Sequence, residues 1–408
     1  MSTTSTAAET KTRSPIAPGD EKFELEGGTP AVEQATGPAG GHARTILLGL
    51  SWLDRLLAVW VLLAMVLGVV IGKFANNADA ALNTATLRGV SIPIVVGLIA
   101  MMWPILTKVQ YEKLPTLFRS THMWRQILLS ILLNWIAGPL VMLAVAWATL
   151  PDLPTYRTGV IMVGLARRCI AMVMIWNQLA HGDGDYCAIL VIVNSILQII
   201  LYPPMSLMFV NIISGERSLR LQYGETAIAV LIYLGIPLGL GVATRWFALV
   251  VLGRERTKKR FLPYFGPVAL LGLLYTIILI FAQQATRITD NIGRVFRIFA
   301  PMITYFLIMW TGTFFLVFWL TRRRGGAKKY GYRMAVVQSF TAGSNNFELA
   351  IAVCVAVYGV NSDQALAATI GPLVEVPVLL GLSYVSLYLR DALRWGEVEA
   401  VSAVDASA

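Results

Sequence analysis

Charged residues are scarce in this chain. Asp, Glu, Lys and Arg make up 14% of its 408 residues, whereas hydrophobic residues make up 56% and the mean hydropathy is +0.66. Soluble domains usually carry about 25% charged residues. This composition excludes an ordinary water-soluble domain and predicts a protein that crosses a lipid bilayer several times.

Cysteine and histidine are scarcer still, with three of each. Three widely separated cysteines argue against a disulfide framework or a zinc site, and all three histidines fall in predicted tail or loop segments. The motifs HExxH and GxxxxGK are absent from the sequence. We therefore expect neither an enzyme nor an ATP-driven pump, and we expect no cofactor.

Basic residues outnumber acidic ones, 33 to 23, which gives a formal net charge of +10. They fall in short stretches between apolar runs, a distribution typical of the loops that set membrane topology. We therefore expect no nucleic-acid partner.

A polar start precedes ten apolar segments. Residues 1–45 lack an apolar signal-peptide core and are predicted to be a disordered tail. Residues 46–390 are predicted to form the membrane domain and residues 391–408 a C-terminal tail. Each apolar segment can cross about 30 Å of hydrocarbon as a helix. The segments cover approximately 53–72, 87–106, 126–150, 158–179, 186–212, 225–244, 263–282, 298–320, 332–358 and 365–388.

An even number of spans places both termini on the same side of the membrane. With the termini in the cytoplasm, the inner loops carry more Lys and Arg than the outer loops, and the positive-inside rule selects this orientation. We expect a multi-pass protein of the plasma membrane, meaning a bacterial inner membrane or its equivalent.

Four charged residues lie deep inside predicted spans: Arg167, Arg168, Glu348 and Glu375. A charge at the bilayer centre costs roughly 2.5–3.5 kcal/mol even on the lenient insertion scale, so such residues usually line a cavity or a solute path. At 1.5 Å per residue, Cys169, Glu348 and Glu375 all fall near the middle of the bilayer. They are expected to meet at one depth.

Spans four and nine hold the same position in two halves of five spans, 46–213 and 225–390. Both carry a polar interruption in mid-span. Because five is odd, the second half must enter from the opposite side, which makes the repeats inverted. Interrupted helices at matching positions of inverted repeats point to the binding site of a transporter. The predicted fold class is therefore an all-α polytopic membrane protein with two inverted five-helix repeats.

Two interpretations of Cys169 are open at this point. A lone thiol in a membrane helix is usually a small apolar filler. The neighbouring Arg167 and Arg168 favour the thiolate form instead, and a thiolate is a soft ligand that prefers soft partners such as trivalent arsenic or antimony. A single thiol would hold such a cargo reversibly, which suits transport.

Glu348 is open to three interpretations: a neutral buried acid, a carboxylate paired with Arg168, or a group that alternates between these states. The alternating group would carry a proton inward as cargo leaves. The second acid, Glu375, lies between Pro372 and Pro377. It is either a second proton site or a hydrogen-bonded helix clamp.

Several uncharged polar residues face a similar choice. They either contact a small hydroxylated solute or bond to neighbouring helices: Asn194, Ser195, Gln198, Asn345 and Asn346. Trp176, at the end of the fourth span, has the position of an aromatic-belt anchor.

Four separated runs carry a family resemblance: CIAMVMIWNQLAHGD, NSILQIILYPP, NNFELAIAV and IGPLVEVPVL. In this order they resemble the signature segments of the arsenite efflux permeases. These permeases are the arsenical-resistance branch of the bile acid, arsenite and riboflavin transporter superfamily. The resemblance covers about residues 50–390.

The resemblance implies the fold of the bile acid sodium symporters: ten helices, a panel domain, a core domain, and broken fourth and ninth helices that cross. It also implies efflux of trivalent arsenic against proton influx. The family's essential thiol matches Cys169, as the substrate ligand, and its essential glutamate matches Glu348. Its other functional positions match Arg168, Trp176, Asn194, Asn346 and Glu375.

The sequence departs from this family at one point. The family pattern has a single Arg between Ala and Cys, whereas this chain has Arg167 and Arg168. An extra residue rotates the preceding helix face by about 100° unless the helix break absorbs it. We favour Arg168 as the residue that faces the site.

Two rival functions are considered. A sodium-coupled organic-anion symporter of the same fold predicts sodium dependence and no need for a thiol. A membrane enzyme or thiol sensor would need a catalytic motif or a signalling domain, and the sequence shows neither. We therefore expect a secondary transporter that exports arsenite by proton antiport, with antimonite as a further candidate cargo. The oligomeric state is left open.

Overall fold

The computed structural model describes residues 57–75, 84–87, 90–109, 111–113, 121–166, 172–214, 222–323, 326 and 329–396. Almost all of these residues are helical, as the apolar segments predict. The expected class, an all-α polytopic membrane protein, is confirmed.

The first half of the chain begins with two spans and a short hairpin. They are α3 (Leu57–Phe74), β1 (Thr86–Leu87), β2 (Val90–Ser91) and α5 (Ile92–Lys108). A 3-10 turn at Tyr111–Lys113 follows. Three further spans complete this half: α7 (Thr121–Ile131) with α8 (Gly138–Thr149), α9 (Pro154–Leu165) with α10 (Met172–Leu179), and α11 (Gly184–Leu207).

The second half follows the same order of spans. It contains α12 (Tyr223–Val230) with α13 (Ile236–Arg256), α14 (Phe265–Asp290), α15 (Ile292–Arg322), α16 (Tyr332–Gly343) with α17 (Phe347–Tyr358), and α18 (Asp363–Thr369) with α19 (Gly371–Ala392). Gly253 has a positive φ of 74°, and the helical path of α13 is broken there.

The hairpin was not expected from the sequence. Its strands pair antiparallel, Thr86 with Ser91 and Leu87 with Val90. The hairpin moves the start of the second span from the predicted residue 87 to Ile92, where Pro93 occupies the first turn. Proline suits that position because the first-turn N–H has no intrahelical partner.

Several spans contain a π-helical turn that ends two residues before a proline. A proline ring clashes with the carbonyl four residues earlier, and a widened turn moves that carbonyl away. These turns are Leu132–Ala137 before Pro139, Leu231–Gly235 before Pro237, and Thr257–Phe261 before Pro263. A further π-helical turn, Met208–Ile213, extends α11 beyond Pro203 and Pro204.

Many large apolar side chains are exposed, for example Leu63, Val66, Ile200, Trp246 and Leu271. Water-soluble proteins rarely expose contiguous apolar surface on this scale. Six helices among the described residues are long and apolar enough to cross a membrane, and three shorter apolar helices accompany them. These exposed surfaces are the faces that meet lipid.

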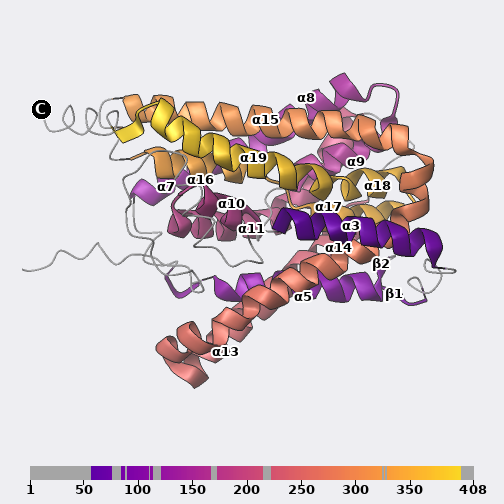
Figure 1. Ribbon diagram of the computed structural model, residues 1–408, viewed down its shortest axis with the longest axis horizontal. Helices are drawn as coiled ribbons and strands as arrows, with labels where there is room; N and C mark the ends of the chain where they lie inside the picture. Colours follow the sequence, from indigo (N-terminus) through magenta and orange to yellow (C-terminus); the bar gives the residue numbers. More distant parts are fainter. Residues whose placement is uncertain are drawn as a thin grey trace, which may run out of the picture.

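The helices form two groups (Figure 1). In the first, which we call the panel, α14 packs on α3 and α5, and α13 packs on α5. The second, which we call the core group, contains α8–α11 and α15–α19; α15 packs on α8 and α16, and α9 packs on α18. The panel holds spans one, two, six and seven.

The helix pairing has a two-fold pattern. Span one packs on span seven (α3 with α14), and in the same way span six packs on span two (α13 with α5). Span three packs on span four (α8 with α9), and in the same way span eight packs on span nine (α15 with α16). In each match, the corresponding spans lie five places apart in the order of spans. The pattern supports the two-repeat interpretation, while the repeat boundaries stay a prediction.

The described start of the predicted C-terminal tail is packed against the core group. Trp395 is buried, and its ring contacts those of Phe314, Phe318 and Tyr332 at centroid distances of 4.8–5.7 Å. The packed chain therefore extends at least to Trp395.

Candidate functional site

The fourth and ninth spans are both broken near their middles. The fourth span ends its first half at Leu165 and resumes at Met172; the ninth pauses at Ser344–Asn346 between α16 and α17. In Figure 1, α9 lies beside α17, and α10 lies beside α16. The first half of each broken span thus meets the second half of the other, as crossing helices require.

A backbone hydrogen bond joins the two breaks directly. The N–H of Asn346 donates to the carbonyl oxygen of Ala166 at 2.8 Å. Both groups would otherwise lack a helical partner, because each lies where a helix stops or starts. Their pairing removes the cost of leaving backbone polar groups unpaired inside the bilayer.

Two tyrosines bond to backbone oxygens of the first half-helices. The hydroxyl of Tyr202 on α11 donates to Met162 O at 3.3 Å, and that of Tyr305 on α15 donates to Ala342 O at 3.2 Å. Both tyrosines are fully buried. Neither tyrosine was predicted to have a role, although Tyr202 lies within the run NSILQIILYPP; Tyr305 lies outside the four runs.

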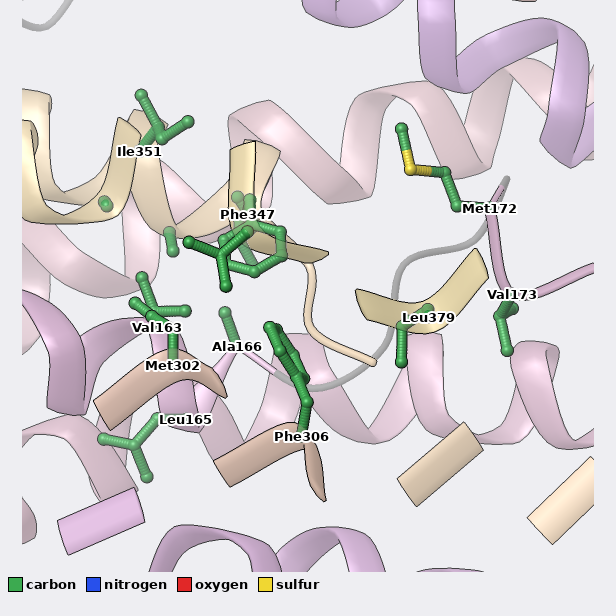
Figure 2. Packing of buried hydrophobic residues seen from close by; sticks show 14 of the residues in the cluster. Val163, Leu165, Ala166, Met172, Val173, Met302, Phe306, Phe347, Ile351 and Leu379 are labelled. Atoms are coloured by element: carbon green, nitrogen blue, oxygen red, sulfur yellow. The ribbon is translucent and has the colours of Figure 1, made fainter. Parts of the chain in front are cut away.

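Apolar side chains fill the space around the crossing. Figure 2 shows Phe347, Phe306, Val163 and Ala166 gathered at this point. The rings of Phe306 and Phe347 lie 6.4 Å apart between centroids. The Phe347 ring also occupies the place that a Cβ on Gly371 would take. Only a glycine at residue 371 therefore leaves Phe347 its position.

Asn346 has a structural role in the ninth break. Its side-chain Oδ1 accepts from the N–H of Leu349 at 3.0 Å and so caps α17, and its Nδ2 donates to Gln198 Oε1 at 3.3 Å. The residue is fully buried. Asn346 holds the second half of the ninth span and ties it to the fifth.

Asn194 bonds to neighbouring helices, one of the two roles expected for it. Its Oδ1 accepts from Trp135 Nε1 at 2.9 Å. Its Nδ2 donates to Leu190 O at 2.9 Å and to Ser130 Oγ at 3.3 Å. The amide of Asn194 therefore fixes the third span against the fifth.

The two membrane carboxylates have different surroundings. Glu348 lies in the first turn of α17, where the helix dipole favours negative charge, and it is partly exposed. Glu375 on α19 is 1% exposed, and neither of its oxygens has a hydrogen-bond partner among the described residues. Glu348 also contributes to the electrostatic surroundings of Glu375, so the two acids are neighbours.

Trp176 lies inside the protein rather than at a lipid-facing surface. Its side chain is 1% exposed, and its Nε1 has no hydrogen-bond partner in the described part of the chain. This placement contradicts the aromatic-belt interpretation.

Three residues of the predicted site lie outside the described residues: Arg167, Arg168 and Cys169. Their expected roles stay predictions. The other two cysteines, Cys187 and Cys354, are buried and form no disulfide in the described part of the chain. Across the described residues, no group of three or more His, Cys, Asp or Glu is placed to hold a metal ion.

Polar contacts join the panel to the core group near the ends of α14 and α17. Gln284 Nε2 donates to Val360 O at 2.6 Å, and Arg287 pairs with Asp363 at 3.4 Å. Asp363 also accepts from Thr155 Oγ1 at 2.9 Å. A small cavity beside these contacts is lined by both groups, including Ile94, Ile280, Ile351, Val355 and Thr369.

The panel contains an ion pair that the sequence analysis missed. Arg245 is 1% exposed, and its guanidinium binds both carboxylate oxygens of Glu112, at 2.6 and 2.9 Å. It also donates to the carbonyls of Thr107 and Lys108. The predicted sixth span ended one residue before Arg245, so this charge was assigned to a loop.

Comparison with known proteins identifies the family. The chain is 39% identical over 349 residues to the arsenical-resistance protein Acr3 of Corynebacterium glutamicum, covering 84% of this chain and 91% of that protein. This chain belongs to the arsenite efflux permease family. A second arsenical-resistance protein Acr3, from Alkaliphilus metalliredigens, is 30% identical over 83% of this chain and 93% of its own length.

Two further comparisons agree with a transporter. An uncharacterized transporter of Synechocystis is 30% identical over 82% of this chain and 88% of its own length. The Sodium Bile acid symporter family matches residues 95–291. Membership of the arsenite efflux permeases, together with the helical structure, makes this chain a multi-pass membrane transporter.

Proposed function

We propose that this transporter exports arsenite from the cytoplasm in exchange for protons, with Cys169 as the arsenic ligand and Glu348 as the coupling carboxylate. The observation that carries the proposal is the hydrogen bond between Asn346 and Ala166. It joins Ala166, three residues before Cys169, to Asn346, two residues before Glu348. The names of the two arsenical-resistance relatives support the choice of cargo.

Chain connectivity supports the proximity of the thiol and the acid. Cys169 is three residues from Ala166, so covalent geometry keeps their Cα atoms within about 11 Å. Glu348 is two residues from Asn346, which bonds to the same Ala166. A cargo bound to the thiol would therefore lie near the carboxylate.

Coupling follows from competition between cargo and proton at neighbouring groups. The side chain of Glu348 is more exposed than that of Glu375, which is fully buried. We assign the main coupling role to Glu348 and a secondary role to Glu375. At about 100 mV, each charge moved inward supplies ~2.3 kcal/mol, roughly a fifty-fold cargo gradient.

Alternating access requires the core group to move relative to the panel. The half-helices α10 and α17 both begin at the crossing, and their N-terminal dipoles add positive potential there. Arg168 and Trp176 complete the proposed substrate-binding set with Asn194 and Asn346. Because both asparagines are bonded within the protein, we expect them to act by holding the half-helices in place.

The test is arsenite accumulation in everted membrane vesicles energised by a proton gradient. We expect Cys169→Ser and Glu348→Gln to abolish accumulation, and collapse of the proton gradient to abolish it in the parent. The matched controls are Cys187→Ser and Cys354→Ser, which alter buried thiols and should transport normally. Parent-like transport by both Cys169→Ser and Glu348→Gln would show the site assignment to be wrong.

A sodium-coupled organic-anion symporter is the second candidate, favoured by the match to the Sodium Bile acid symporter family. The same vesicles distinguish the two. Arsenite movement that follows a sodium gradient and ignores the proton gradient, or uptake of a bile acid with no arsenite transport, would support the symporter.

A further inference from the structure

We propose that Asn345 recognises the hydroxyl groups of the cargo. The inference rests on the proposed function, because neutral arsenite carries three hydroxyl groups on arsenic. Each hydroxyl both donates and accepts a hydrogen bond, and a carboxamide side chain offers one acceptor and one NH₂ donor group.

Two buried asparagines near the crossing are already bonded within the protein. Asn194 uses its oxygen for Trp135 and its nitrogen for Leu190 and Ser130. Asn346 uses its oxygen to cap α17 and its nitrogen for Gln198. Neither amide can bind cargo without breaking bonds that hold helices together.

Asn345 differs from both. It is fully buried, and neither Oδ1 nor Nδ2 has a hydrogen-bond partner among the described residues. Proteins rarely leave a buried amide without partners, and each exception calls for a physical explanation. A polar cargo that visits the crossing during each transport cycle supplies one.

Other unpaired polar atoms lie in the ninth break and on the two helices beside it, α11 and α19. Ser344 Oγ, Gln198 Nε2 and both oxygens of Glu375 are buried without partners in the described structure. The backbone N–H of Asn345 lies close enough to Glu375 to act on its charge, although the two do not reach hydrogen-bond geometry. The crossing thus offers donors and acceptors together, as a neutral polyhydroxyl solute requires.

The position of Asn345 fits a cargo held by a thiolate. Asn345 precedes the residue whose N–H bonds to Ala166, and Ala166 is three residues before Cys169. A bond between arsenic and the Cys169 sulfur would replace one hydroxyl of arsenite, which leaves as water with the thiol proton, and would keep two hydroxyls on arsenic. Asn345 lies in the break of the ninth span, and its side chain would bond to these hydroxyls. The thiol would hold the metalloid, and Asn345 would select its oxygen substituents.

The test compares one substitution at two fully buried sites, Asn345→Leu and Asn194→Leu, in a chain whose Cys187 and Cys354 are replaced by Ser. The readout is protection of Cys169 from N-ethylmaleimide by added arsenite, together with thermal stability of the purified protein in detergent. Protection reports binding without requiring transport.

We expect Asn345→Leu to keep or raise the melting temperature, since it removes unpaired polar atoms, whereas Asn194→Leu should lower it. In Asn345→Leu, Cys169 should react with the maleimide at the parent rate without arsenite. Half-protection should require about ten-fold more arsenite, because hydrogen bonds to the cargo are lost.

The test separates failure of the proposed function from failure of the proposed role of Asn345. If arsenite does not protect the parent, the proposed function fails at this site. If arsenite protects the parent and Asn345→Leu at the same concentration, that function stands and the role of Asn345 is refuted. If Asn345→Leu is destabilised as much as Asn194→Leu or does not accumulate, Asn345 is structural and the inference is overturned.

Discussion

The backbone N–H of Asn346 lies 2.8 Å from the carbonyl oxygen of Ala166, and this bond joins two helix breaks that are 180 residues apart in the chain. Each break leaves backbone groups that lipid cannot satisfy. Because each break satisfies the other, two polar interruptions can coexist near the middle of the membrane.

The cap on α17 should determine the stability of this crossing. Asn346→Ala removes both the cap to Leu349 and the bond to Gln198, so we expect a loss of about 2 kcal/mol. Asn346→Asp keeps a capping oxygen but cannot donate to Gln198, so about 1 kcal/mol should be lost. Thermal unfolding in detergent measures both, and equal melting temperatures for Asn346→Ala and the parent would refute the capping role.

The position of the Phe347 ring should require a glycine at residue 371. In Gly371→Ala the new methyl group would overlap the Phe347 ring, and overpacking of this kind typically costs about 1–3 kcal/mol. The displaced ring precedes Glu348, so arsenite transport should also fall. Gly381→Ala on the same helix is the control, since a Cβ there meets nothing within 4 Å. A stable, fully active Gly371→Ala variant would contradict this packing.

The contact between Arg287 and Asp363 should restrict movement of the core group against the panel. Arg287→Gln removes the ion pair across the two groups and should open the neighbouring cavity to the side opposite the chain termini. The measurement is labelling of Thr369→Cys, a cavity residue, by an impermeant maleimide in a chain without native thiols.

We expect several-fold faster labelling in Arg287→Gln. The control is Arg297→Gln, which breaks the ion pair with Asp152 between α15 and the residues that precede α9. Labelling at the same rate in Arg287→Gln and the parent would show that this pair does not close the cavity.

The buried ion pair between Arg245 and Glu112 should contribute more to the stability of the protein than a solvent-exposed ion pair does. Glu112→Gln leaves the buried Arg245 guanidinium without a counter-charge, and we expect a loss of about 2 kcal/mol. Arg297→Gln breaks a solvent-exposed pair and should not measurably change the melting temperature. A larger loss in Arg297→Gln than in Glu112→Gln would contradict this ranking.

The same pair predicts a pH dependence with a definite sign. Burial alone would raise the pKa of Glu112, but the hydrogen bond and charge of Arg245 hold that pKa below its ordinary value of 4.5. The stabilisation is therefore present above the unfolded pKa and is lost as the pH falls through the lower folded pKa. The difference in melting temperature between the parent and Glu112→Gln should shrink below about pH 4.5.

Much of the fold was predictable because lipid leaves a chain few options. A backbone in hydrocarbon must satisfy its own hydrogen bonds, so apolar runs of about 20 residues become helices. Each of the ten predicted segments overlaps one or two of the observed α-helices. Polar interruptions of the fourth and ninth spans were expected from Arg167 and Arg168 and from the run of residues 341–348. The hairpin before α5 escaped prediction because its strands are only two residues long.

The roles of polar side chains were not predictable in the same way. Asn194, Asn345 and Asn346 are the same residue type in apolar surroundings, yet two are bonded to other helices and one has no partner among the described residues. Trp176 likewise had the sequence position of a lipid-facing anchor but is buried. Whether a polar side chain finds a hydrogen-bond partner depends on the distance between packed helices, and the hydropathy of the sequence does not predict that distance.

The amino-acid sequence by itself determined that this protein is helical, crosses the membrane repeatedly and interrupts two of its spans, because the free energy of placing each residue in lipid depends mainly on its own type. Only the tertiary structure decided that the two interruptions meet, that Phe347 needs Gly371, and that Asn345 is left without a partner among the described residues. Those outcomes depend on how helices far apart in the chain pack and which polar atoms their packing brings within bonding distance.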